Sequence, residues 1–236
     1  MRILIAAFWL CSLQAELPPK GITVSQWLRE DYFSAYLGND MAGFAKGEAK
    51  AKELLEANAD NNEARGWWAS GKLYLAARAY QAGRAGEGDA LFAAARQESQ
   101  RALARKDGAA VRTLGASFIL LADRLPADKR EALYREGRSL FAIVRQQEDA
   151  MLDKMPLHFK GEVLAAQAQA AMRLGLREEA TKYLNEIVAK LPDTHYSQIA
   201  EKWLADPASA AKTQLVCQSC HEPNRLANRL KAIAAK

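Results

Sequence analysis

Apolar residues recur with the 3.6-residue period of an amphipathic helix along most of this chain, and the alternation typical of a half-buried strand is absent. Alanine, leucine, glutamate, lysine and arginine are abundant, whereas β-branched residues are scarce. Half of the 236 residues are hydrophobic, which is enough apolar material to bury a core. The sequence therefore predicts an all-α protein of about nine helices.

The clearest pair of helices is expected within residues 159–204. The apolar stripe of its first helix ends at Gly175, and its second helix ends before Pro192. Small residues such as Ala180 would let two helices approach closely. This unit resembles a tetratricopeptide repeat, and the resemblance puts Gly175, Ala180 and Leu184 on positions that the family expects.

Earlier segments show the same helical period at wider spacing. Helices are expected over residues 44–57, 63–82 and 90–105, and the glycine-rich stretch 83–89 is predicted to be the loop between the second and the third. These segments extend the resemblance over about residues 40–204. The resemblance implies an irregular tetratricopeptide-like solenoid of helical hairpins, each packed on its neighbours.

The first fifteen residues have the pattern of a secretory signal peptide. Arg2 is the positive start, an apolar run follows, and we expect cleavage after Ala15. The run is too short to span a bilayer, and no other segment is long and apolar enough, so the mature chain is expected to lack a transmembrane segment. We therefore predict a periplasmic or secreted protein with a signal peptide at 1–15, a helical domain at 16–204 and a linker and tail at 205–236.

Cleavage removes Cys11 and leaves two cysteines, both within the motif Cys217-Gln-Ser-Cys220-His221. This C-x-x-C-H pattern is typical of covalent c-type haem attachment. Two thiols at this spacing can form thioethers with both vinyl groups of one haem c, while the adjacent imidazole reaches the iron. His221 is therefore expected to be the proximal ligand. Haem attachment requires export, which the signal peptide would supply.

The segment after the motif is too short for a complete cytochrome c fold. Residues 222–236 contain neither methionine nor histidine, so a sixth iron ligand would have to come from the helical body or from a partner, or be missing. His195 is a speculative distal ligand, because it is the histidine closest in sequence to the linker. His158, which follows Pro156 at a helix start, is expected to be structural.

The tail itself carries an apolar stripe beside basic residues. Leu226, Leu230 and Ile233 recur at helical spacing, and Arg225 and Arg229 accompany them. In a haem protein this segment would cover one haem edge and contact the propionates.

Other readings of the motif remain open. An oxidising compartment would favour a Cys217–Cys220 disulfide, which would leave His221 as a surface residue. A thioredoxin-like role is less favoured because no βαβ pattern surrounds the pair. A zinc site would require four ligands, and only three candidates are local.

Several other functional classes have no support in the sequence. The formal charge of +5 is spread over mixed acidic and basic residues without a long basic block, so no nucleic-acid partner is expected. There is no phosphate-binding loop after a strand and no catalytic constellation, so we do not expect an enzyme. The leading prediction is an exported scaffold that binds a protein partner, such as a periplasmic redox protein, and transfers electrons through one haem. The alternative is an interaction module without haem.

Overall fold

The computed structural model describes residues 17–105, 107–216 and 224–234. Within these ranges the regular elements are ten α-helices and two short 3₁₀-helices, without a strand, so the predicted all-α class is confirmed. In chain order they are α1 (Val24–Gly38), α2 (Met41–Ala57), α3 (Asn62–Gln81), α4 (Ala85–Leu103), α5 (Gly108–Ala122), α6 (Ala127–Glu148), η1 (Asp149–Lys154), α7 (Leu157–Arg173), α8 (Arg177–Lys190), α9 (His195–Ala205), η2 (Pro207–Lys212) and α10 (Arg225–Ala234).

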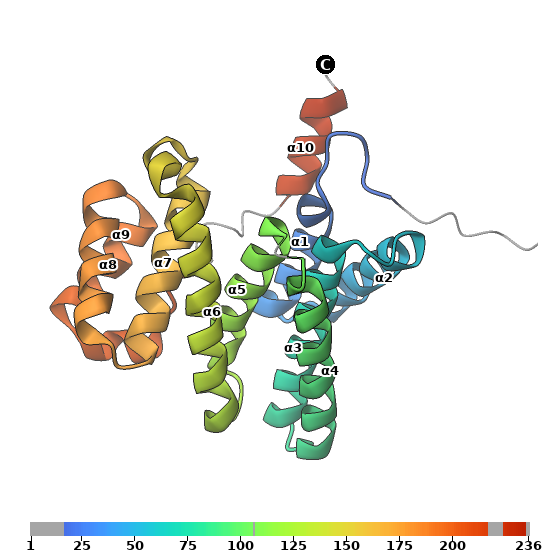
Figure 1. Ribbon diagram of the computed structural model, residues 1–236, viewed down its shortest axis with the longest axis horizontal. Helices are drawn as coiled ribbons and strands as arrows, with labels where there is room; N and C mark the ends of the chain where they lie inside the picture. Colours follow the sequence, from blue (N-terminus) through green and yellow to red (C-terminus); the bar gives the residue numbers. More distant parts are fainter. Residues whose placement is uncertain (1–16, 106, 217–223, 235–236) are drawn as a thin grey trace, which may run out of the picture.

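Consecutive helices pack against each other as antiparallel hairpins, because the connections between them are short. The pairs α1–α2, α3–α4, α5–α6 and α7–α8 follow one another along the longest axis of the molecule, and α9 packs on α8 (Figure 1). The helical solenoid expected from the sequence is thus present. The exception to this order is α10, which lies beside α1 although it is the last helix in the chain (Figure 1).

Local capping explains where many helices begin. The Thr23 side chain accepts a hydrogen bond from the Gln26 N–H, and the Gln26 side chain accepts one from the Thr23 N–H, which forms a capping box at the start of α1. Thr194 and Ser197 make the same exchange at α9. Aspartate or asparagine side chains cap α2, α3 and α5. These caps satisfy N–H groups that have no partner inside the helix.

The sequence prediction was wrong about the start of α4. Residues 83–89 were expected to form a loop, but the helix already begins at Ala85. Gly88 is accommodated because α3 passes close by: a Cβ atom on Gly88 would lie 2.7 Å from the Tyr80 ring. The Tyr80 hydroxyl also donates a hydrogen bond of 2.6 Å to Asp89 Oδ1. Tertiary packing on α3 therefore outweighs the low helix propensity of the glycines.

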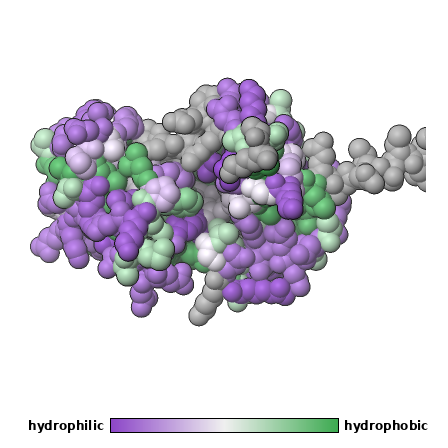
Figure 2. Space-filling view, turned by 90° about the horizontal axis from the view of Figure 1, so that it is seen from above, coloured by the Kyte–Doolittle hydropathy of each residue, from purple (hydrophilic) through white to green (hydrophobic). Residues whose placement is uncertain are grey.

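Two central helices, α5 and α7, are buried along most of their length. Every residue from Ala110 to Ala122 is buried except Arg112, and every residue from Gly161 to Ala171 is buried. No helix in the described part of the chain is both long and apolar enough to cross a membrane. The face seen from above in Figure 2 is mainly hydrophilic, and hydrophobic side chains form separate patches on it.

In the C-terminal half, a side chain of α9 packs directly on the backbone of α7. Gly161 lies against the ring of the fully buried Tyr196, and a Cβ atom at this position would overlap three ring carbons. Ala180, at the start of α8, is also completely buried, as its expected place in the repeat requires.

We predict that Gly161→Ala lowers the free energy of unfolding by about 1–3 kcal/mol, because Tyr196 has to move to make room for the new methyl group. Gly86→Ala is the matched control, since Gly86 is exposed in α4 and its new methyl group would meet no atom within 4 Å. It should raise stability by up to about 1 kcal/mol. Urea unfolding measures both changes, and equal effects of the two variants would contradict the close approach.

Candidate functional site

The residues proposed from the sequence fall in different parts of the structure. Cys217, Cys220 and His221 lie outside the described residues. His195 is the first residue of α9 and is exposed. His158 is the second residue of α7, and its side chain is only 11% exposed. The site is therefore built from the described residues that flank the motif and from the cavity beside them.

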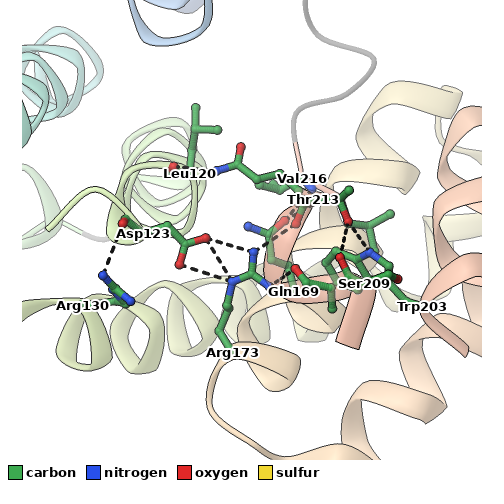
Figure 3. A network of polar contacts seen from close by, with 12 residues as sticks. Leu120, Asp123, Arg130, Gln169, Arg173, Trp203, Ser209, Thr213 and Val216 are labelled. Carbon is green, nitrogen blue, oxygen red and sulfur yellow. Dashed lines mark hydrogen bonds and ion pairs between the residues drawn. The ribbon is translucent and has the colours of Figure 1, made fainter. Parts of the chain in front are cut away.

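The segment before the motif is fixed to the helical body by buried polar contacts. Gln169 of α7 is completely buried, and its Oε1 atom accepts hydrogen bonds from the backbone N–H groups of Leu215 at 2.7 Å and Val216 at 3.0 Å (Figure 3). The Gln214 side chain donates to the Leu120 carbonyl of α5 at 3.2 Å. Leu215 and Val216 are themselves buried. The chain thus leaves the described region from a defined position on α5 and α7.

Arg173 forms the second part of this attachment (Figure 3). Its guanidinium donates to the carbonyl oxygens of Ala210 and Thr213, and its Nη2 atom lies 3.0 Å from Oδ2 of Asp123, the C-cap residue of α5. Trp203 Nε1 donates to Thr213 Oγ1 at 2.7 Å. One arginine therefore joins α5, α7 and the segment after α9.

The segment after the motif is held at the other side, by α1. The Glu30 carboxylate accepts hydrogen bonds from the N–H groups of Asn224 at 2.8 Å and Leu226 at 3.0 Å. These groups belong to the start of α10, where a negative charge complements the helix dipole. Asn224 has a φ of 66°, in the left-handed region that asparagine tolerates better than most residues. Glu30 thereby sets where α10 begins.

A cavity of about 900 Å³ lies between α1, α3, α5, α7 and α10. Its wall is formed by Thr23, Ser25, Gln26, Arg29, Phe33, Glu63, Trp67, Ala109, Arg112, Thr113, Ala116, His158, Phe159, Glu162, Leu226, Asn228 and Arg229. The helices that meet here are distant in sequence. The tail residues Leu226, Asn228 and Arg229 close one side, so the cavity depends on the return of the chain to α1.

Aromatic rings form the apolar part of the wall. Phe33 and Trp67 meet edge to face with their ring centres 5.6 Å apart, and both are buried. The Trp67 Nε1 atom donates to Ser25 Oγ at 3.1 Å, which fixes the indole. The Arg112 guanidinium lies over the Phe159 ring, 5.5 Å from its centre, and Phe159 is 41% exposed.

The charged residues of the wall are mainly basic. Arg29, Arg112 and Arg229 face only two glutamates, Glu63 and Glu162. Burial raises the pKa of Glu162 to about 7, although the Arg112 and Arg29 guanidinium groups oppose this shift. Burial thus weakens the negative charge that Glu162 contributes to the wall at neutral pH. The cavity consequently favours an anionic group.

Arg112 and His158 are two residues of the wall that lie beside carboxylate side chains. Arg112 forms an ion pair with Glu148, yet its Nη1 atom is buried and has no hydrogen-bond partner among the described residues. His158 Nε2 lies 3.8 Å from Glu162 Oε2, one helical turn further along α7. These groups give the wall a guanidinium with unused donor capacity and an imidazole with a carboxyl group beside it.

One residue of the cavity wall was not expected from the sequence to have a functional role. His158 was expected to be structural. The spacing of His158 and Glu162 does place them on one helix face. Nothing in the sequence, however, brings them to Arg29 or to the tail, because those contacts join segments that are far apart in the chain.

We predict that Gln169→Leu lowers the free energy of unfolding by about 1–3 kcal/mol, because two buried N–H groups lose their acceptor. Hydrogen exchange at Leu215 and Val216 should become faster. Gln167→Leu is the matched control on the same helix. Gln167 is equally buried and, like Gln169, has an Nε2 atom without a partner among the described residues, but it does not accept the hydrogen bonds of Leu215 and Val216, so its replacement should be neutral or stabilising. Unchanged exchange at Leu215 and Val216 in Gln169→Leu would contradict this attachment.

Comparison with known proteins adds no family to this description: no protein-family model, no curated protein and no solved structure matches the chain.

Proposed function

We propose that this chain is an exported tetratricopeptide-like scaffold that carries one haem c, attached at Cys217 and Cys220 with His221 as the proximal iron ligand. It transfers single electrons between protein partners, of which a periplasmic redox protein is the leading candidate. The signal-peptide pattern of residues 1–15 and the C-x-x-C-H motif are independent sequence features that both support this proposal.

The observation that carries the proposal is the attachment of the chain on both sides of the motif. Val216, directly before Cys217, is held by Gln169 on α7. Asn224, three residues after His221, is held by Glu30 on α1. Covalent geometry keeps the Cα atom of His221 within about 11 Å of that of Asn224. Both attachments are on helices that also contribute residues to the cavity wall, which supports a haem site near the cavity.

The residues of the cavity fit a haem. A volume of about 900 Å³ lies within the range of about 300–1,000 Å³ that is typical of ligand sites. The rings of Phe33 and Trp67 offer apolar surface to a macrocycle. Arg112, whose Nη1 atom lacks a partner among the described residues, and Arg229 offer guanidinium groups to the two propionate carboxylates.

A haem held there would supply a one-electron Fe(III)/Fe(II) couple for exchange with redox proteins. Phe33 and Trp67, which are buried, would exclude water from one side of the site. Arg29 and Arg112 would add positive charge to a partly buried site, which favours the electron-richer state of any redox group bound there. Leu226 and Asn228 of α10 would close the side towards the tail.

Details of the last hairpin support the tetratricopeptide-like description. Gly175 follows α7 with a φ of 73°, a conformation that glycine adopts without strain. Ala180 and Leu184 are buried at the α8 positions where the repeat places small and apolar residues. Solenoids of such hairpins commonly present extended surfaces to protein partners.

The attachment is tested by producing the chain in a host with haem-attachment machinery. We predict that the exported protein retains haem on a denaturing gel, because thioether bonds survive unfolding, and that Cys217→Ala combined with Cys220→Ala abolishes this retention. Ser219→Ala is the matched control, since it changes the motif without touching its cysteines or histidine, and it should keep the haem.

The opposite result is equally clear. A haem-free parent protein from such a host, with an intact mass that shows Cys217 and Cys220 joined in a disulfide, would overturn the proposal. It would leave the interaction module without haem as the better account.

A further inference from the structure

We propose that a second pocket, at the C-terminal ends of α1 and α3, binds the phosphate group of a small organic phosphate monoester. The pocket has a volume of about 500 Å³ and shares no lining residue with the cavity of about 900 Å³. Its wall combines the last turns of α1 and α3 with three arginine side chains, Arg78, Arg84 and Arg124. The inference is independent of the haem proposal.

The positive charge of this pocket is not balanced by carboxylates. None of the described lining residues is acidic. Arg84 pairs with Glu87, but both side chains are more than half exposed, so this ion pair is weak. Arg78 and Arg124 form no ion pair in the described part of the chain. The carboxylate of Asp123, next to Arg124 in sequence, pairs instead with a residue of α7.

The guanidinium groups of Arg78 and Arg124 are held in defined positions. Both lie against the ring of the buried Tyr74, with their Cζ atoms 5.7 Å and 6.0 Å from its centre. Arg124 Nη2 donates to the Tyr36 carbonyl, and Arg78 Nη1 donates to Asn39 Oδ1. The other nitrogens of each group donate to no atom of the described structure, so they are available to a ligand. Donors fixed in advance lower the entropic cost of binding.

The helix ends that border the pocket do not cancel this charge. A helix C-terminus carries about half a negative elementary charge, and arginine side chains often interact with such ends. The last turns of α1 and α3 together therefore contribute about one negative charge, which is half of the opposite charge on Arg78 and Arg124. A positive surplus remains for an anionic ligand.

The arrangement of the donors favours phosphate over a single carboxylate. Arg78 belongs to α3, whereas Arg124 follows α5, so their donors reach the pocket from two elements. A tetrahedral phosphate dianion presents acceptor oxygens in several directions, and its charge matches that of two guanidinium groups. A planar carboxylate presents one pair of oxygens and one charge.

The pocket has room for more than the phosphate itself. Its volume lies within the range of about 300–1,000 Å³ that is typical of small-molecule sites. Leu37, which is 47% exposed, and Ala82 offer apolar surface beside the arginines. The ligand class is therefore an organic phosphate monoester rather than free phosphate.

Isothermal titration calorimetry of the full-length protein, at about pH 8 and constant ionic strength, tests this assignment. Glycerol 3-phosphate should bind, inorganic phosphate should compete with it, and acetate should bind at least about tenfold more weakly. Arg78→Gln and Arg124→Gln should each weaken glycerol 3-phosphate binding by at least about tenfold, because each removes charge-assisted hydrogen bonds.

Arg135→Gln is the matched control, since it removes the same charge from an arginine of α6 that is 66% exposed and lies outside the pocket wall. The affinity of this variant should stay within about twofold of the parent, because an exposed charge far from the ligand is screened. Circular dichroism establishes that each variant is folded, and if Arg124→Gln does not fold, Arg78→Gln decides.

Several results would overturn the inference. A parent that binds neither phosphate compound has no such site, and an equal loss of affinity in Arg135→Gln would point to general surface charge. Acetate that binds as tightly as glycerol 3-phosphate would exclude phosphate as the recognised group. Tighter binding of inorganic phosphate than of glycerol 3-phosphate would exclude an ester as the ligand. None of these measurements depends on haem attachment, so the haem proposal stands or fails separately.

Discussion

The contact between Arg173 and Asp123 determines how the C-terminal part of this chain is arranged. The arginine is 12% exposed and the aspartate 29%, and the same guanidinium also binds two carbonyl oxygens of the segment after α9. A largely buried ion pair of this kind adds little net stability over an apolar packing, but removal of one partner is costly, because the other charge stays buried. The network therefore contributes chiefly to a single arrangement of α5, α7 and the segment after α9, rather than to overall stability.

The cavity depends on this fixed position of the C-terminal segment. If residues 207–216 were a free linker, α10 would have no defined place. Because Gln169 holds Val216 and Glu30 holds Asn224, the chain between them starts at α7 and ends at α1. The tail then supplies one wall of a site whose other walls come from α1, α3, α5 and α7. A helical repeat array, which by itself offers mainly outer surfaces, thereby gains a partly enclosed site.

The polar residues inside α5 and α7 are consistent with this role. A helix buried on all sides is normally apolar throughout. Here α7 buries Glu162, Gln167 and Gln169, and α5 has Arg112 as its one residue between Ala110 and Ala122 that is not buried. Gln169 is explained by the attachment of the tail, and Arg112 and Glu162 lie in the cavity wall. We find no partner for the Gln167 amide nitrogen among the described residues and no physical account of it.

The sequence alone determined the helical class and most helix boundaries, because each depends on local signals such as the 3.6-residue period and the caps. It also contains the C-x-x-C-H pattern on which the haem proposal rests. It missed the early start of α4, where Gly88 is favoured by the Tyr80 ring of α3 rather than by its own propensity. Only the tertiary structure brought His158 to Arg112 and Leu226, since these residues are far apart in the chain and each looks ordinary in its own segment. Long-range packing decides which helix faces meet, and no local pattern encodes the point at which a returning tail closes a cavity.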